Sequence, residues 1–188
     1  MRKIIVTEFM TLDGVMEDPG GGDGSKYGGW SGQYWNHEAE DFKHDELFAS
    51  DALLLGRITY QGFAAAWPTM TDETGFAERM NSVPKYVVST TLKTVEWNNT
   101  KIIKENVFND ISKLKQAPGQ DITVHGSGQL VNFLMKNDLV DEFRLMIHPI
   151  VLGEGKQLFK DNVNIKKLRL IEAKPFHSGV VVLQYKPI

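Results

Sequence analysis

The chain has 188 residues, of which 41% are hydrophobic and 24% are charged, as expected for a soluble globular protein of ordinary domain size. Its net charge of −3 and pI near 6.0 argue against nucleic-acid binding, which normally requires a basic patch. The absence of cysteine excludes disulfides, thiol catalysis and Cys-ligated metals, and the five histidines are scattered, so we expect no metal site. The apolar run after Met1 is too short for a secretory signal or a membrane span, which predicts a cytoplasmic protein without a membrane partner.

The amino-terminal part combines a β-branched strand with a long loop. Residues 3–10 predict the strand, and Asp13-Gly14 marks the turn after it. Residues 18–32, called the glycine-rich loop below, are too long for an ordinary connection, and their aromatic residues favour a functional lid over disorder. We interpret Trp30 as a mobile residue that covers substrate and Trp35 as the anchor of the loop. The alternative is that these aromatic residues only fix the loop to the domain.

Two expected strands pass through glycine directly into helices. Residues 52–55 form a short apolar run that ends at Gly56, and residues 122–125 lead into Gly126-Ser-Gly. Such a turn presents unpaired backbone N–H groups at the positive end of a helix dipole, which is the geometry that binds phosphate. Arg57 adds a guanidinium and Thr59 a hydroxyl. The alternative is that Gly56 is a plain turn followed by a solvated arginine.

Hydrophobic periodicity and turn residues predict the other elements. Helices are expected at 36–49, 57–66, 71–81 and 107–115, with a further one that ends at 135. Further strands are expected at 85–89, 101–103, 139–151, 168–173 and 180–185. Helices alternate with strands early and strands dominate late, so we predict one α/β domain over residues 1–188, with helices on both faces of a mixed sheet. The apolar strands at 143–152 and 180–185 would be hazardous at an open sheet edge, and we therefore predict a homodimer.

Five short motifs occur in order along this sequence. They are Thr11-Leu-Asp-Gly14, Leu-Leu-Leu-Gly-Arg-Ile-Thr-Tyr60, Val-Val-Ser-Thr90, Gly126-Ser-Gly128 and His148-Pro-Ile-Val-Leu-Gly-Glu-Gly155. Together they resemble the dihydrofolate reductase superfamily and, more narrowly, the reductase domain of the bacterial riboflavin-biosynthesis deaminase/reductase and its stand-alone relatives. The resemblance covers residues 1–185. It implies a three-layer α/β/α domain around a mixed sheet of about eight strands, and an NADPH-dependent oxidoreductase that reduces a pterin- or pyrimidine-like heterocycle.

The resemblance also implies a cofactor site at the two glycine turns. Gly56, Arg57 and Thr59 would hold phosphates of NADPH, and Ser89 and Thr90 would flank its 2′-phosphate. The pyrophosphate and nicotinamide ribose would contact Gly126, Ser127, Gly128, Gln129 and Leu130, and the nicotinamide and substrate would contact Thr11, Asp13 and Gly14. The sequence shows no obvious acidic partner for a ribose 2′-hydroxyl, which favours NADPH over NADH.

The sequence does not identify a single proton donor. In folate-reducing relatives, a carboxylate on the helix before the Gly-Arg strand contacts the pterin. The corresponding helix carries several acidic residues, and we rank Glu40 and Asp41 first as catalytic candidates, with Asp13 as their rival.

The substrate is less defined than the cofactor. Lys26 is the only basic residue of the glycine-rich loop, so the loop offers no cationic cluster for the ribose phosphate of a riboflavin-pathway substrate. The physiological substrate is therefore expected to differ from that compound. An alternative function is a non-catalytic module that binds a nucleotide or flavin as a sensor or carrier, because it would need the same glycines.

Overall fold

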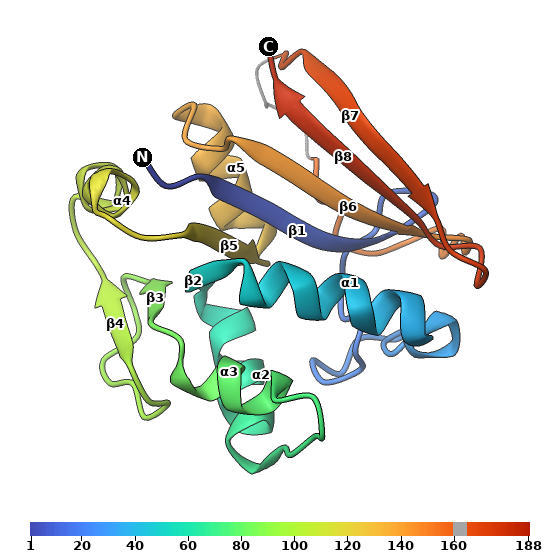
Figure 1. Ribbon diagram of the computed structural model, residues 1–188, viewed down its shortest axis with the longest axis horizontal. Helices are drawn as coiled ribbons and strands as arrows, with labels where there is room; N and C mark the ends of the chain where they lie inside the picture. Colours follow the sequence, from blue (N-terminus) through green and yellow to red (C-terminus); the bar gives the residue numbers. More distant parts are fainter. Residues whose placement is uncertain (160–164) are drawn as a thin grey trace.

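A mixed sheet of eight strands with helices on both faces organises the chain, as the computed structural model shows for residues 1–159 and 165–188 (Figure 1). The strands are β1 (Ile4–Thr11), β2 (Ser50–Gly56), β3 (Lys85–Val88), β4 (Thr100–Ile103), β5 (Asp121–His125), β6 (Glu142–His148), β7 (Leu168–Pro175) and β8 (Val181–Pro187). The helices are α1 (His37–Phe48), α2 (Arg57–Ala66), α3 (Phe76–Ser82), α4 (Val107–Gln116) and α5 (Gly128–Lys136), with short 3-10 turns at Gly32–Tyr34 and Trp67–Thr69. The predicted three-layer fold with about eight strands is confirmed.

The strand order is β4-β3-β2-β5-β1-β6-β8-β7. All neighbours from β4 to β6 pair in parallel, whereas β8 runs antiparallel to both β6 and β7. The carboxyl ends of the parallel strands therefore meet at one edge, where open α/β sheets bind their ligands. Both glycine turns predicted from the sequence lie at this edge.

Each face of the sheet is covered by its own helices. On one face, Ile111 of α4 and Leu134 of α5 pack with Val6 and Val124 of the central strands. On the other, Leu47 of α1, Tyr60 of α2 and Met80 of α3 pack on the central and outer strands. Burial of a leucine-sized side chain contributes about 1.5–3 kcal/mol, so these two clusters fix the positions of the helices that flank the site. None of the described helices is long and apolar enough to cross a membrane.

Two predicted elements are shorter than expected. The helix expected at 71–81 begins only at Phe76, because the Asp72 carboxylate accepts the backbone N–H groups of Thr74 and Ala77 and holds the chain in a turn. The strand expected at 139–151 covers only β6, since the Leu139 amide still bonds to a carbonyl at the end of α5.

The strands that we expected at an open edge of the sheet, 143–152 and 180–185, do not lie there. β6 and β8 both lie inside the sheet, and β4 and β7 form its edges (Figure 1). The order of strands depends on long-range pairing, which periodicity does not show. On the β7 edge, Leu170 is 50% and Ile171 is 46% exposed.

Candidate active site

The starts of α2 and α5 meet at the carboxyl edge of the sheet. Their strands, β2 and β5, are direct neighbours, and the two glycines allow the turns to touch. A Cβ atom on Gly56 would lie 2.3 Å from Ser127 Oγ, and one on Gly126 would lie 2.4 Å from Thr59 Oγ1. Neither helix has a side-chain cap, so the first-turn N–H groups of both helices are available to an anion.

The residues proposed for the 2′-phosphate lie one strand further along. Gly56 pairs in register with Val88, which precedes Ser89 at the end of β3. Arg57 is exposed and donates to the Gln61 side chain at 2.8 Å, so its guanidinium lies at the surface of α2. The Ser89 hydroxyl is buried and accepts amides of its own turn, whereas Thr90 is exposed.

The segment at the start of α5 divides into backbone and core positions. Gly126, Ser127 and Gly128 are half-buried, and Gln129 is exposed. Leu130 is 5% exposed and belongs to the core beneath α5, so only its backbone faces the turn.

The turn after β1 is tied to a distant loop by one carboxylate. Asp13 accepts the Thr11 hydroxyl at 2.5 Å and the Gly153 amide at 2.8 Å, while Gly14 adopts a positive φ of 84°. The Thr11 hydroxyl, followed by backbone amides, holds the pKa of Asp13 below its ordinary value. Asp13 is therefore an anion and an acceptor at neutral pH, which makes it a poor source of a proton.

The glycine-rich loop is pinned from within. Asp18 is buried and accepts the amides of Gly22 at 2.7 Å and Ser25 at 3.1 Å. A Cβ atom on Gly28 would lie 2.2 Å from the Asp18 carboxylate, so glycine is needed there for close approach. The loop is a carboxylate-centred structure, and its glycines serve packing as well as turns.

The roles expected for the two tryptophans were wrong. Trp30 is only 4% exposed, donates from Nε1 to the Glu17 carbonyl at 2.9 Å, and packs edge-on against His148 with ring centres 5.0 Å apart. Trp35 is 42% exposed, with its ring 6.1 Å from that of Phe9. Trp30 is thus the anchor, whereas Trp35 remains accessible, as does Tyr27, which is 41% exposed.

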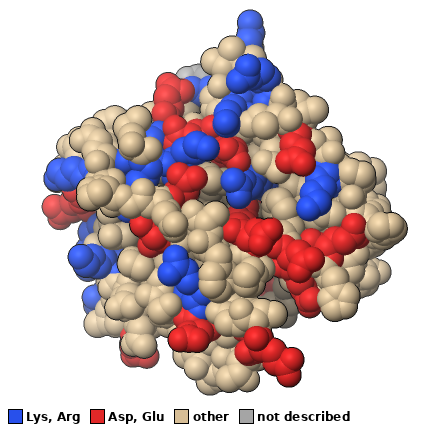
Figure 2. Space-filling model, viewed as in Figure 1, with Lys and Arg blue, Asp and Glu red and all other residues tan. Residues whose placement is uncertain are grey.

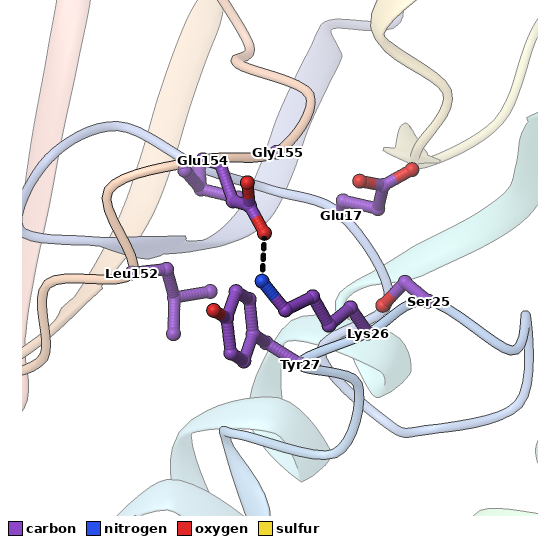
Figure 3. A pocket seen from close by; sticks show the side chains of 8 residues that line it. Glu17, Ser25, Lys26, Tyr27, Leu152, Glu154 and Gly155 are labelled. Atoms are coloured by element: carbon purple, nitrogen blue, oxygen red, sulfur yellow. Dashed lines mark hydrogen bonds and ion pairs between the residues drawn. The ribbon is translucent and has the colours of Figure 1, made fainter.

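A pocket of about 220 Å³ separates the glycine-rich loop from the loop at 152–155 (Figure 3). Lys26 and Tyr27 line it on one side, and Lys26 Nζ lies 2.7 Å from a carboxylate oxygen of Glu154 on the other. Lys156 forms a second ion pair, with Glu17. Each cation beside this pocket is therefore already matched by a carboxylate.

The helix carboxylates favoured from the sequence lie on the outer side of α1. Glu40 is exposed and accepts Trp35 Nε1 at 3.3 Å, and Asp41 is exposed as well. Acidic side chains gather over this helix in Figure 2. Their position near the amino end of α1 complements the helix dipole.

The inner side of α1 carries a buried ion pair that the sequence reading missed. Lys43 and Glu46 pair with each other, Lys43 Nζ donates to Thr7 Oγ1 at 2.9 Å, and Thr7 Oγ1 donates to Glu46 at 2.8 Å. Arg144 of β6 lies 3.4 Å from the second oxygen of Glu46. Burial alone would raise the pKa of Glu46, but the charge of Lys43 and its hydrogen bond hold it below the ordinary value. Helical spacing from Ala39 and Leu47 was the available signal, because it places Lys43 and Glu46 on the buried face.

Two more titratable groups with strongly shifted pKa values lie in the middle of β1 and at the end of β5. Glu8 accepts the Gly126 amide at 2.8 Å, and burial raises its pKa to about 8, so it is mainly protonated at pH 7. Burial, followed by the charge of Lys43, lowers the pKa of His125 to about 3, so its imidazole is neutral. Its Nε2 atom is enclosed and has no hydrogen-bond partner among residues 1–159 and 165–188.

A mixed sheet with two uncapped helix starts at its carboxyl edge defines a dihydrofolate-reductase-like α/β domain. The chain belongs to the RibD C-terminal domain family, which matches residues 2–182. The expected membership of the riboflavin-type reductases is thereby confirmed.

Individual relatives agree with this assignment. YyaP of Bacillus subtilis (strain 168) is 34% identical over 98% of this chain and 94% of its own length. The structure of a Shewanella sp. PV-4 protein, provisionally named for riboflavin biosynthesis, has a TM-score of 0.78 and 22% identity, covering 99% of each chain. The structure of the deaminase/5-amino-6-(5-phosphoribosylamino)uracil reductase of Thermotoga maritima has a TM-score of 0.66 and 14% sequence identity. The match covers all of this chain and 57% of the Thermotoga chain. At such identities the two structures show the common fold.

Proposed function

We propose that this protein is an NADPH-dependent reductase of a pterin- or pyrimidine-like heterocycle. The observation that carries the proposal is the contact between the starts of α2 and α5, at Gly56 and Gly126. Two sets of unpaired N–H groups at neighbouring strand ends suit the diphosphate of a dinucleotide. Membership of a reductase-like family supports turnover over simple binding.

The residues present fit such a cofactor. The first turns of α2 and α5 would bind the phosphates, with Arg57 and Thr90 next to the 2′-phosphate, and Thr11 and Gly14 would border the nicotinamide. When bound, the reduced nicotinamide supplies a hydride. The protein's own part is to hold the phosphates, to exclude water and to present the substrate.

The ion pairs beside the pocket favour a substrate without a phosphate group. Lys26 is matched by Glu154 and Lys156 by Glu17, so a phosphate bound at either lysine would meet a carboxylate beside it. We therefore propose a heterocycle that differs from the phosphoribosyl compound in the name of the Thermotoga protein.

Two measurements test the function. NADPH and NADH affinity are determined by titration calorimetry, and NADPH oxidation is followed with pterins, flavins, quinones and the riboflavin-pathway intermediate with and without its phosphate. We expect tighter binding of NADPH than NADH and oxidation with at least one unphosphorylated heterocycle. Tight NADPH binding without oxidation by any compound would instead support the non-catalytic binding module.

We also propose a homodimer, now through the open edge of β7. An exposed edge strand with apolar side chains such as Leu170 and Ile171 is stabilised when another chain covers it. Light scattering at micromolar concentration should give a dimer mass, and Ile171→Lys should shift it toward the monomer. A monomer mass for the wild-type protein would refute the proposal.

A further inference from the structure

The buried pair under α1 lies beside the glycine turn that precedes α5. Thr7 and His125 are register partners on β1 and β5, and Gly126 follows His125 directly in the α5 turn. Lys43 reaches Thr7 Oγ1 from α1, so its ammonium lies near the carboxyl end of β5, where His125 pairs with Thr7. Its Nζ also lies 5.6 Å from the ring centre of Phe9, which neighbours the exposed Trp35.

Two polar groups of this cluster lack a partner. An ammonium has three N–H donors, and those of Lys43 reach Thr7 and Glu46, leaving one without a partner in the part of the chain that the structure describes. His125 Nε2 is the enclosed polar atom noted above, and the charge of Lys43 acts on it. A buried polar group without a partner costs about 1–3 kcal/mol, so a polar ligand edge that bonded to both groups would be stabilised by them.

The charged and titratable groups around Lys43 differ in whether they carry a proton that they could donate to a substrate. Glu46 on α1 is an anion that accepts from Lys43 and Thr7, and Arg144 on β6 is permanently charged. His125 on β5 is neutral. Glu8 carries a proton, but it follows Thr7 on β1 and therefore points to the other face, where it accepts from Gly126. Lys43 is thus the group on the α1 face that carries a proton on an N–H without a partner among the described residues.

We propose that Lys43 is the catalytic residue that protonates the heterocycle during its reduction; this inference rests on the proposed function. Hydride from the reduced nicotinamide dinucleotide bonds to the carbon of a C=N or C=O group, and the π electron pair moves to the heteroatom. The heteroatom takes a proton from Lys43 Nζ, which is left as a neutral amine beside Glu46 and Thr7. A solvent proton restores the ammonium after product release. In total, one reduced dinucleotide, one heterocycle and one proton are converted into the oxidised dinucleotide and the reduced heterocycle.

Lys43→Arg tests the donor role directly. Arginine keeps a positive charge beside Glu46, but a guanidinium does not give up its proton in proteins. We expect NADPH affinity within about twofold of wild type and a turnover number lower by roughly 10²–10⁴-fold, the usual contribution of general acid catalysis. The matched control is Lys115→Arg, because Lys115, on the buried side of α4, is also ion-paired, with Asp141 at 2.6 Å. The control should keep wild-type turnover.

Lys43→Ala provides a second test of the donor role, because removal of the lysine side chain opens space for a small amine. Methylammonium added to this variant should restore part of the lost turnover and should leave the Lys115→Arg variant unaffected. Wild-type turnover in Lys43→Arg, or loss in Lys43→Ala without rescue, would overturn the donor role while the proposed function stands. Failure of the wild-type protein to oxidise NADPH with any heterocycle would overturn both.

Discussion

Gly56→Ala probes the contact on which the cofactor site depends. The new Cβ would lie 2.3 Å from Ser127 Oγ, 3.0 Å from Ser127 Cβ and 3.2 Å from Ser127 N. The hydroxyl can rotate away, but the other two atoms belong to the start of α5, so the two turns must separate. Overpacking of this kind costs about 1–3 kcal/mol. For a chain of this length each kcal/mol lowers Tm by roughly 2–4 °C.

The assay combines thermal unfolding with NADPH titration. Separated turns no longer aim both sets of N–H groups at one diphosphate, so NADPH affinity should fall along with Tm. Gly62→Ala is the matched control, because its Cβ would meet nothing closer than Asp23 Oδ1 at 3.8 Å, and alanine favours the α2 helix by about 0.5–1 kcal/mol. Wild-type Tm and NADPH affinity in Gly56→Ala would refute the reasoning.

A double variant separates the clash from other effects. Ser127→Gly removes both side-chain atoms that the new Cβ would meet, leaving only the amide at 3.2 Å. Gly56→Ala should therefore cost less in the Ser127→Gly background than in the wild type, a non-additivity of the kind that contacting residues show. If the losses of stability in the two single variants simply add in the double variant, the effect of Gly56→Ala does not come from its contact with Ser127.

Three further substitutions have defined outcomes. Arg57→Ala should weaken NADPH binding by about 1.5–3 kcal/mol, the range for a hydrogen bond to a charged group, and NADH binding less; equal NADPH affinity would exclude the phosphate role. Trp30→Ala should destabilise the fold by about 3–5 kcal/mol, because the ring is buried, and a Tm within two or so degrees of wild type would contradict its position. The raised pKa of Glu8, about 8 against 4.5, stabilises the fold at low pH, and this contribution is lost as pH rises through 8. Between about pH 6.5 and 8, above the window in which His125 acts in the opposite direction, wild-type stability should fall with pH and that of Glu8→Gln should fall less; parallel curves would refute this.

Local sequence signals predicted the turns well, because glycine and hydroxyl residues act where they stand. Gly56 and Gly126 both follow buried strands and precede helices, and the structure places them at adjacent strand ends. The same local signals could not show which of the two tryptophans, Trp30 or Trp35, is buried. Burial of Trp30 depends on His148 and on the Glu17 carbonyl, and His148 is more than a hundred residues away in the sequence.

The acidic side chains of α1 show a related limit of local sequence signals. Carboxylates near the start of a helix are common because they complement its dipole, so Glu40 and Asp41 carried little information about the cleft. Lys43, which we propose as the proton donor, lies on the buried face of the same helix. A lysine at such a position is almost never left without a partner, and its i,i+3 partner Glu46 was visible in the sequence.

The register between β1 and β5 joins the two halves of the site. It sets Thr7 opposite His125, and Gly126 then falls next to Glu8. A slip of one residue would turn Thr7 away from α1 and leave Lys43 with Glu46 alone, because successive strand residues point to opposite faces. The same slip would bury the wrong residues beneath α5, where Val6 and Val124 now pack. The hydrophobic core therefore specifies the register that also places the phosphate-binding turn within reach of the proposed proton donor.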